Sequence, residues 1–225
     1  MHAPVIAVDG PAGSGKSSVC RGVASALGLR YLDTGAMYRA MTWWMLRHDV
    51  DVHDPEAVAA RSAEPRIESG TDPLQPTITV DGADVAEAIR GEDVNAAVSP
   101  VSAVPQVRSR MQAMQRAVIE DALAGGGIVV EGRDIGSVVW PEAAVKVYLS
   151  ADAAARALRR AAEEGGSDVD ATRESLLARD RIDTTRTSSP LVLADGAVHV
   201  DTTDLTLDEV IETIVGMVTS VEVGP

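Results

Sequence analysis

The stretch Gly10-Pro11-Ala12-Gly13-Ser14-Gly15-Lys16-Ser17 decides the fold of this chain. It matches the pattern G-x-x-x-x-G-K-[S/T] and follows the apolar run Val5-Ile6-Ala7-Val8, which predicts a short buried strand. In such a loop the glycines let consecutive backbone N–H groups point at phosphate oxygens, and the next helix adds the positive end of its dipole. A chance match is the alternative, but the strand, the spacing and the terminal Lys-Ser pair are all present. The sequence therefore predicts a loop that binds a nucleoside triphosphate.

The pattern also predicts roles for single residues of the loop. Lys16 is expected to reach the β- and γ-phosphates, and the Ser17 hydroxyl is expected to ligate Mg²⁺. ATP is the expected donor, with the turn at 201–204 as a candidate contact for the adenine. The residues expected to bind the triphosphate are Gly10, Pro11, Ala12, Gly13, Ser14, Gly15, Lys16, Ser17 and Ser18.

Composition indicates one soluble α/β domain. The 225 residues suit a single domain with insertions, and 45% hydrophobic residues suffice for a full core. The single cysteine, Cys20, cannot form an internal disulfide and is expected in the core, as are Met37, Met41, Trp44 and Met45 at helical spacing. No apolar run approaches a membrane span and the first residues lack a signal pattern, so a cytoplasmic protein is expected.

The net charge of −14 argues against a nucleic-acid partner, because a polyanion would be repelled at long range. A nucleotide site then requires that basic residues gather in one cleft. Of the 20 basic residues, only Lys16 and Lys146 are lysines. A compositional bias toward arginine would explain why lysine is so rare. Because the chain otherwise uses arginine, the lysine at position 16 of the loop is hard to attribute to chance.

Hydrophobic periodicity predicts strands that alternate with helices. Strands are expected at about 5–9, 30–32, 128–130, 145–149 and 197–201, and helices at about 15–27, 35–48, 105–124, 152–163, 170–182 and 206–219. This order predicts a three-layer α/β/α fold with a central parallel sheet. Residues 64–93 predict a small antiparallel β insertion, because 77–80 alternates before an Asp81-Gly82 turn. The loop 163–167 predicts a flexible, lid-like element.

Arginine stands beside other polar residues at four places where predicted core elements end. They are Asp33–Arg39, Ser99 with Arg108, Glu131–Asp134 and Arg179–Arg186. The first and third follow predicted strands, where open α/β sheets bind ligands. Because the planar guanidinium matches phosphate oxygens and stays protonated, the pattern predicts a second phosphate site opposite the triphosphate. A solvated surface residue is the alternative for each arginine by itself. Candidates for contact with the transferred phosphoryl group are Arg156, Arg159 and Arg160.

In these motifs the chain resembles the bacterial cytidylate kinases, a family of nucleoside monophosphate kinases. The resemblance covers nearly all of the chain, and its anchors are Gly10–Ser17, Leu32–Arg39, Glu131–Asp134 and Arg179–Asp183, together with the β insertion. It implies one P-loop kinase domain over 1–225. The implied parts are a core at about 1–33, 94–155 and 187–225, a monophosphate-binding region with the β insertion at about 34–93, and a helical lid at about 156–186.

The resemblance also implies roles for single residues, position by position. The implied catalytic residues are Lys16, Arg133, Arg156 and Arg160. The implied acceptor site consists of Arg39, Arg133 and Arg186 for the monophosphate, Ser99, Arg108 and Asp134 for the cytosine, Arg179 and Asp183 for the sugar, and Thr34 as a further contact. Glu131 stands where the family commonly has Asp. This difference affects only a role of that residue in supporting other site residues or in binding Mg²⁺.

The implied reaction is phosphoryl transfer from ATP to CMP or dCMP, carried out by a monomer. A phosphate acceptor needs no general base, since it is already charged near neutral pH. Three alternatives stay open at this point: another P-loop small-molecule kinase, a nucleotide-dependent switch ATPase, and a regulatory module without chemistry. The first would lack the β insertion. A nucleotide-dependent switch ATPase would be expected to have an apolar strand ending in Asp-Glu or an N-K-x-D motif, and the sequence has neither.

Overall fold

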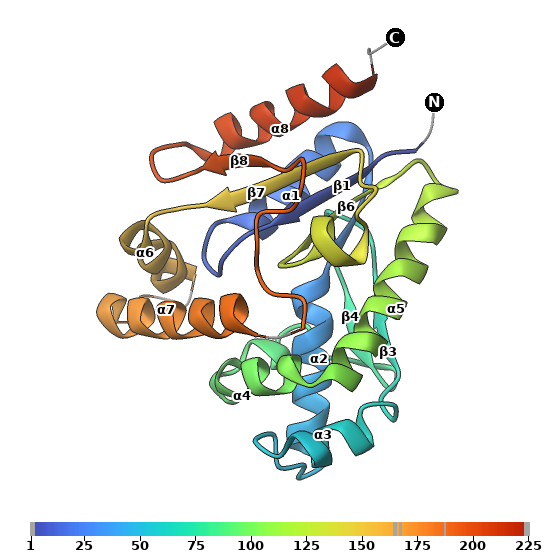
Figure 1. Cartoon of the computed structure of the whole chain (residues 1–225), viewed down its shortest axis with the longest axis vertical. Coiled ribbons are helices and arrows are strands. Elements are labelled where there is room, and N and C mark those ends of the chain that lie inside the picture. Colours follow the sequence, from blue (N-terminus) through green and yellow to red (C-terminus); the bar gives the residue numbers. More distant parts are fainter. Residues whose placement is uncertain (1–2, 164–165, 167, 187, 223–225) are drawn as a thin grey trace.

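A computed structural model of the chain describes residues 3–163, 166, 168–186 and 188–222. Within them a central sheet of parallel strands has the order β2-β6-β1-β7-β8 (Figure 1). Its strands are β1 (Val5–Asp9), β2 (Arg30–Asp33), β6 (Ile128–Gly132), β7 (Val145–Ser150) and β8 (Val198–Asp201). They lie where the apolar runs predict them, so the parallel sheet is confirmed.

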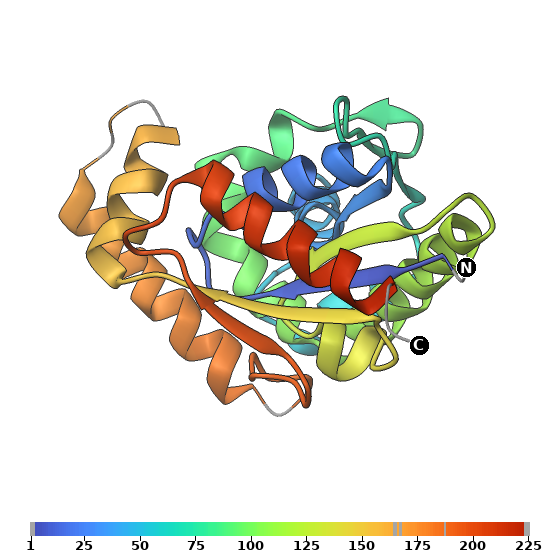
Figure 2. The same cartoon turned by 90° about the horizontal axis from the view of Figure 1, so that it is seen from above.

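The helices described lie on both faces of this sheet and beyond one end of it. They are α1 (Lys16–Leu27), α2 (Thr34–Arg47), α3 (Pro55–Arg61), α4 (Glu92–Ala103), α5 (Pro105–Leu123), α6 (Ala153–Glu163), α7 (Val169–Thr185) and α8 (Leu207–Glu222). Figure 2 shows α1 and α8 together on one face, where they contact each other.

The side chains of β1 alternate between two cores, one on each face of the sheet. Val5 and Ala7 pack in the core that α2 and α5 cover, whereas Ile6 and Val8 pack in the core that α1 and α8 cover. The residues expected in these cores, Cys20, Met37, Met41, Trp44 and Met45, are buried there. Because both faces are covered, the fold has the three α/β/α layers that the sequence predicts.

The insertion after α3 carries the predicted antiparallel sheet, in the order β3-β4-β5. Its strands are β3 (Ile67–Ser69), β4 (Ile78–Val80) and β5 (Ala83–Asp84). Asp81 and Gly82 join β4 to β5 with φ angles of +51° and +83°, as a two-residue hairpin turn requires. The Asp81 carboxylate accepts from Trp44 Nε1 at 2.9 Å and from the Arg66 N–H at 2.8 Å, which ties the hairpin to α2.

Periodicity does not predict α3 and α4, and the structure adds both. The start of α3 has local signals, since the Asp54 side chain accepts from two N–H groups of its first turn and Pro55 is its first residue. By contrast, α4 contains Pro100, a residue that usually breaks a helix. Its buried residues, Val94 and Val98 among them, hold this helix in place by tertiary packing.

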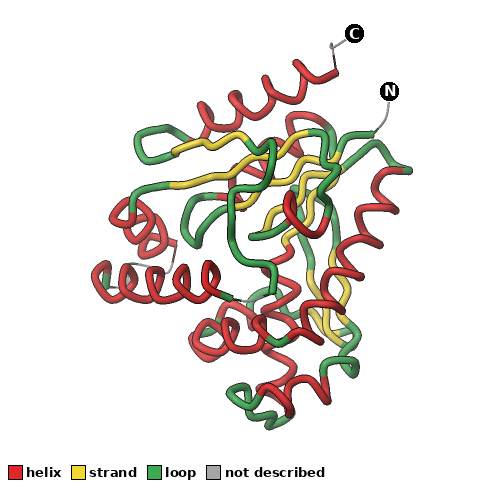
Figure 3. The backbone as a smooth tube through the Cα atoms, in the orientation of Figure 1, coloured by secondary structure: helices red, strands yellow, loops and turns green. Residues whose placement is uncertain are grey.

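The helices α6 and α7 pack against each other beyond the carboxyl end of β7 (Figures 1 and 3). The lid loop expected at 163–167 falls mostly outside the described residues, at 164, 165 and 167. The second helix continues to Thr185 rather than ending at 182. Among the described residues, no helix combines the length and apolarity needed to cross a bilayer.

Candidate active site

The phosphate loop joins β1 to α1 in a conformation that requires glycine. Gly10 has a φ of +151°, and a Cβ there would lie 2.1 Å from the Leu149 carbonyl oxygen. Gly13 and Gly15 have φ angles of +75° and +81°. Gly15 is also the N-cap of α1 and offers no side chain to its first N–H groups. The start of α1 is therefore built to receive an anion.

Lys16 lies along the inside of this loop. Its Nζ donates to the Pro11 carbonyl at 2.7 Å and lies 3.4 Å from Ser14 Oγ, which itself donates to the same carbonyl at 3.0 Å. Burial and the positive charge of Arg133 lower the pKa of Lys16. Phosphate oxygens beside the ammonium would oppose that shift, because they favour its charged form.

Ser17 meets an acidic pair at the ends of two neighbouring strands. Its hydroxyl donates to Glu131 Oε1 at 2.8 Å, and Glu131 lies opposite Asp33 in the β2–β6 register. Burial and the negative charge of Asp33 raise the pKa of Glu131. The other carboxylate oxygen of Glu131 is buried without a hydrogen-bond partner among the described residues.

These oxygen donors fit Mg²⁺. A serine hydroxyl beside an unpartnered carboxylate oxygen is the kind of ligand that this hard cation takes, with the rest of its shell supplied by phosphates and water. A cluster of three or more His, Cys, Asp or Glu able to hold a metal by itself is missing from the part of the chain that the structure describes. The residues thus suit a metal that arrives with the triphosphate.

Beside the phosphate loop lies an inner pocket, whose lining includes Lys16, Thr34, Arg108, Asp134, Asp183 and Arg186. Its floor is a buried ion pair: Arg108 Nη2 donates to Asp134 Oδ2 at 2.6 Å, with side chains 2% and 6% exposed. The guanidinium of Arg108 also lies over the Tyr38 ring, 5.4 Å from its centroid. Arg108 Nε and the Tyr38 hydroxyl are buried without hydrogen-bond partners among the described residues. Both groups can therefore still form hydrogen bonds with a bound ligand.

A second group of charges in the inner pocket centres on Asp183 of α7. Its two carboxylate oxygens accept from Arg133 Nε at 2.9 Å and from Arg186 Nη1 at 3.3 Å. Burial alone would raise the pKa of Asp183, but these neighbouring arginines lower it overall. Arg186 Nη2 lies 3.8 Å from Asp134 Oδ1, so the two aspartates share one arginine. Arg133 Nη1 donates to the Gly10 carbonyl at 2.7 Å and joins this group to the phosphate loop.

An outer cleft lies between α4 and α7, and Arg179 lines both it and the inner pocket. Arg160 and Ser99 line the outer cleft as well. Burial and the charges of Arg179 and Arg160 lower the pKa of Arg39 to about 9, so Arg39 lies within electrostatic reach of both. The Arg39 guanidinium donates to Asn95 Oδ1 on α4 at 2.6 Å. This excess of positive charge in an acidic protein indicates an anion site.

The helices α6 and α7 contact the phosphate loop through another ion pair. Arg156 of α6 donates to the Asp180 carboxylate of α7 and, at 3.1 Å, to the Ala12 carbonyl. The other Asp180 oxygen accepts from the Ala12 N–H at 3.3 Å. Side chains of α6 and α7 thus hold Ala12 through both its N–H and its carbonyl group.

The structure brings most of the predicted site residues together, with some differences of place. Thr34 is buried and donates to the Glu131 carbonyl at 2.6 Å. Ser99 lines the outer cleft, whereas Ser102, which the motifs do not single out, lines the inner pocket and accepts from Arg108 at 3.3 Å through its carbonyl. Ser18 is exposed on α1.

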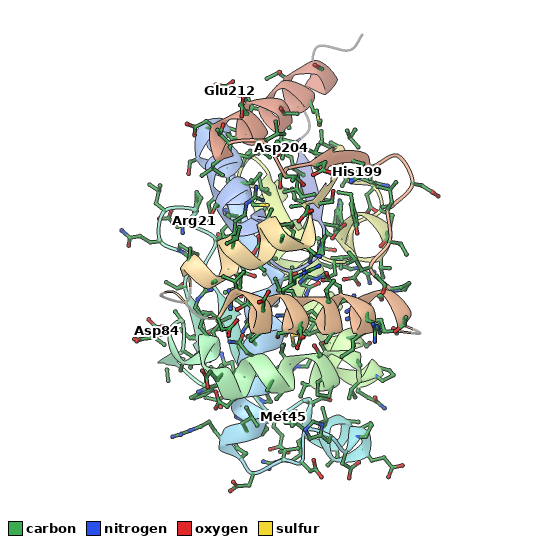
Figure 4. All side chains as sticks on the ribbon, turned by 90° about the vertical axis from the view of Figure 1, so that its left-hand side faces the viewer. Arg21, Met45, Asp84, His199, Asp204 and Glu212 are labelled. Carbon is green, nitrogen blue, oxygen red and sulfur yellow. The ribbon has the colours of Figure 1, made fainter. Side chains whose placement is uncertain are left out.

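Sequence reasoning also missed Tyr38 and Asp180, although each stands inside a quoted motif beside an arginine. His199 has no part in the pocket, because it lies on β8 with Nε2 2.7 Å from Ser150 Oγ. In Figure 4, which faces α6, α7 and α4, His199 and Asp204 lie above the α6 helix.

The chain is similar to known proteins over nearly its whole length. The family model of cytidylate kinase matches residues 6–220. A cytidylate kinase of Streptomyces avermitilis is 56% identical over 218 residues, covering 97% of this chain and 94% of the relative. A cytidylate kinase of Nocardia farcinica is 52% identical over 212 residues, covering 92% and 90%. Among solved structures, an uncharacterized protein of Eubacterium ventriosum has a TM-score of 0.53 at 12% identity, covering 97% of this chain and 99% of that one, which is a likeness of fold alone.

Proposed function

This chain belongs to the cytidylate kinase family, and from that premise we propose which of its residues carry out each part of the reaction. It is an ATP-dependent kinase that transfers a phosphoryl group to CMP or dCMP, giving ADP and CDP or dCDP. The family assignment removes the switch ATPase, the regulatory module and the other small-molecule kinases. One observation carries the acceptor assignment: Arg108, Arg133 and Arg186 meet two buried aspartates beside Lys16.

The donor triphosphate binds on the phosphate loop, from Gly10 to Ser18. Lys16 turns from the Pro11 carbonyl to the β- and γ-phosphates, where its charge is needed. Ser17, with Glu131 beside it, would hold Mg²⁺. When bound, Mg²⁺ offsets negative charge on the phosphate oxygens.

The acceptor phosphate binds to Arg39, Arg133 and Arg186. A monophosphate carries a charge of about −1.5 to −2 near neutral pH, so its oxygen attacks without a general base. The work of the site is then positioning and charge neutralisation. Arg156 and Arg160, from the lid, offset charge on the transferred group and help exclude the water that would otherwise accept it.

The cytosine is read by Asp134 and Arg108, with Ser99 at the edge of the site. The Asp134 carboxylate accepts from the exocyclic amine of cytosine, and Arg108 donates to O2 or N3. Uracil has a carbonyl where cytosine has the amine, and it would place that oxygen against a buried carboxylate. We therefore expect CMP to be preferred over UMP.

The sugar contacts Arg179 and Asp183, which suit a 3′-hydroxyl and so accommodate ribose or deoxyribose. The inner pocket has a volume of about 80 Å³, against roughly 300 Å³ for the smaller small-molecule sites. We propose that α7 moves relative to α4 when the acceptor enters, as expected of a lid. We also propose that the enzyme works as a monomer in the cytoplasm without a nucleic-acid partner, and size-exclusion chromatography tests the monomer.

The test is an assay of ADP release with CMP, dCMP, UMP and AMP as acceptors, on the wild type and on Asp134→Ala. We expect CMP and dCMP to be the best acceptors, and the variant to narrow the CMP/UMP ratio of kcat/KM more than it changes the KM for ATP. Asp134→Asn serves as the milder variant, because removing Asp134 leaves Arg108 buried without its acid. An unchanged ratio in both variants removes Asp134 from base recognition. Acceptor-independent ATP hydrolysis by the wild type would contradict the kinase assignment.

A further inference from the structure

Asp9, the last residue of β1, has no role in the site described above, yet it is 4% exposed and lies next to Gly10. Its two carboxylate oxygens accept from the backbone N–H groups of Ile135 and Gly136, both at 2.8 Å. These N–H groups open a short buried helical turn, Ile135–Val139, directly after Asp134. A carboxylate satisfies both donors, whereas a serine or asparagine side chain has one oxygen to offer.

Gly10, which follows Asp9 and begins the phosphate loop, contacts the same segment on the other side of Asp134. The Gly10 carbonyl accepts from Arg133 Nη1 at 2.7 Å. Asp134 is therefore flanked by two attachments, one through Arg133 and one through Ile135 and Gly136. They end on consecutive residues, Gly10 at the start of the phosphate loop and Asp9 at the end of β1. The Asp134 carbonyl closes the turn by accepting from Val138 and Val139.

This arrangement constrains where the Asp134 side chain can point. Its φ of −144° and ψ of 25° differ from those of a helix or a strand, so the backbone here depends on its attachments. The segment packs closely against its neighbours at Gly136, since a Cβ there would lie 3.2 Å from the Lys146 side chain and 3.4 Å from Ala194. A displaced Asp134 would lose its short contact with Arg108.

We propose that Asp9 is a positioning residue for acceptor selectivity: by holding the Ile135 and Gly136 N–H groups, it fixes the Asp134 carboxylate for cytosine relative to the phosphate loop. The inference rests on the proposed role of Asp134 as a reader of the base. It extends that role, since the strand that carries the donor-binding loop would also set the geometry of base recognition. A purely structural Asp9 would stabilise the fold without changing the choice of base.

The experiment compares Asp9→Asn with the wild type in steady-state assays with CMP, UMP and ATP. The Asn side chain has nearly the same shape, but its amide group faces one of the two N–H donors. We expect the CMP/UMP ratio of kcat/KM to fall by about 5- to 30-fold, the factor that corresponds to a change of about 1 to 2 kcal/mol. The KM for ATP should change by less than about twofold. Asp121→Asn is the control, because Asp121 is a 76% exposed acid paired with Arg30 on the surface, and it should leave the ratio unchanged.

Two further measurements separate the possible failures. In the Asp134→Ala background, Asp9→Asn should no longer change the CMP/UMP ratio, because the group that it positions is gone. Hydrogen exchange of the Ile135 and Gly136 amides should become faster in Asp9→Asn, and all assays are run below the Tm of each variant. If Asp9→Asn does not fold, Asp9→Ser takes its place, because its shorter side chain removes both carboxylate acceptors.

Each outcome bears on a different claim. If Asp134→Ala leaves the CMP/UMP ratio unchanged, the proposed base reader itself is wrong. If Asp134→Ala changes the ratio but Asp9→Asn and Asp9→Ser do not, the role of Asp9 is overturned while the base reader stands. A rise in the KM for ATP that equals the loss for CMP would also overturn it, because Asp9 would then support the phosphate loop instead.

Discussion

At the scale of single residues, substitution of Lys16 tests the role proposed for the phosphate loop. The Lys16 ammonium lies inside the loop and donates to the Pro11 carbonyl at 2.7 Å. We expect Lys16→Met to lower kcat by about 10²- to 10³-fold, the usual effect of losing one donor to the transition state. Steady-state assays with saturating CMP and ATP measure this.

The chain supplies a matched control, because its other lysine lies outside the site. Lys146 does not line the inner pocket or the outer cleft, and its Nζ donates to the Asp195 carbonyl at 3.0 Å. Lys146→Met should keep kcat within about twofold of the wild type. Near-normal turnover by Lys16→Met would reject the role assigned to Lys16.

At the scale of elements, α6 and α7, the proposed lid, contact the phosphate loop through Asp180. This carboxylate joins α7 to Arg156 of α6 and to the Ala12 N–H, so it links two helices and the loop at one point. We expect Asp180→Asn to lower kcat by about tenfold, because a charge-assisted contact between α6, α7 and the phosphate loop is weakened. The CMP/UMP ratio should stay unchanged, since Asp134 and Arg108 are untouched.

The control for this prediction is on the same helix. Asp170 is exposed in the first turn of α7, away from the loop, and Asp170→Asn should leave kcat unchanged. Measurements of kcat and of the base preference for both variants decide the matter. If Asp180→Asn alters the base preference as much as kcat, the lid contact is not separate from acceptor recognition.

At the scale of the whole molecule, stability and pH are linked through Asp9. Burial raises the pKa of Asp9 to about 6 from the ordinary value of 3.8, although its two backbone N–H partners oppose the shift. Between these pH values the folded protein binds more protons at Asp9 than the unfolded chain does. The stabilisation from this group is therefore fully present below pH 3.8 and is lost as pH rises through about 6.

Comparison with Asp9→Asn isolates that effect, because an asparagine does not titrate. The free energy of unfolding of the wild type, minus that of the variant, should fall by about 3 kcal/mol between about pH 3.5 and pH 7. Urea unfolding at a series of pH values measures both proteins. A difference that stays constant or rises with pH would contradict the assigned pKa.

Net charge and local charge also differ at this scale. The chain carries −14 overall, yet the inner pocket and the outer cleft are lined by arginines. These arginines outnumber the carboxylates that pair with them. Burial and the positive charge of Arg133 lower the pKa of Arg179 to about 10. The basic residues gather in an inner pocket and an outer cleft that share Arg179, rather than in the one cleft expected, and Arg39 lines neither of the two. The long-range repulsion of polyanions is thus combined with a local attraction for phosphates.

Much of the fold follows from local patterns. The apolar runs place the strands, the Gly-rich loop places the turn between β1 and α1, and the Asp81-Gly82 dipeptide places the hairpin. Each of these depends on residues a few positions apart, which is why periodicity finds them. The helix α4 is the exception, since Pro100 argues against it and its buried side is stabilised by distant elements.

The site follows from the sequence only as far as its motifs are contiguous. The loop from Gly10 to Ser17 and the run that ends at Asp134 predict where phosphate and base are bound, because strand ends of a parallel sheet meet at one edge. Which atoms meet there is a property of the folded chain. Asp9 is 126 residues from Ile135, and Ala12 is 168 residues from Asp180, yet each pair is hydrogen-bonded. Contacts across such separations depend on strand order and on helix packing, and no local pattern in the chain encodes either of them.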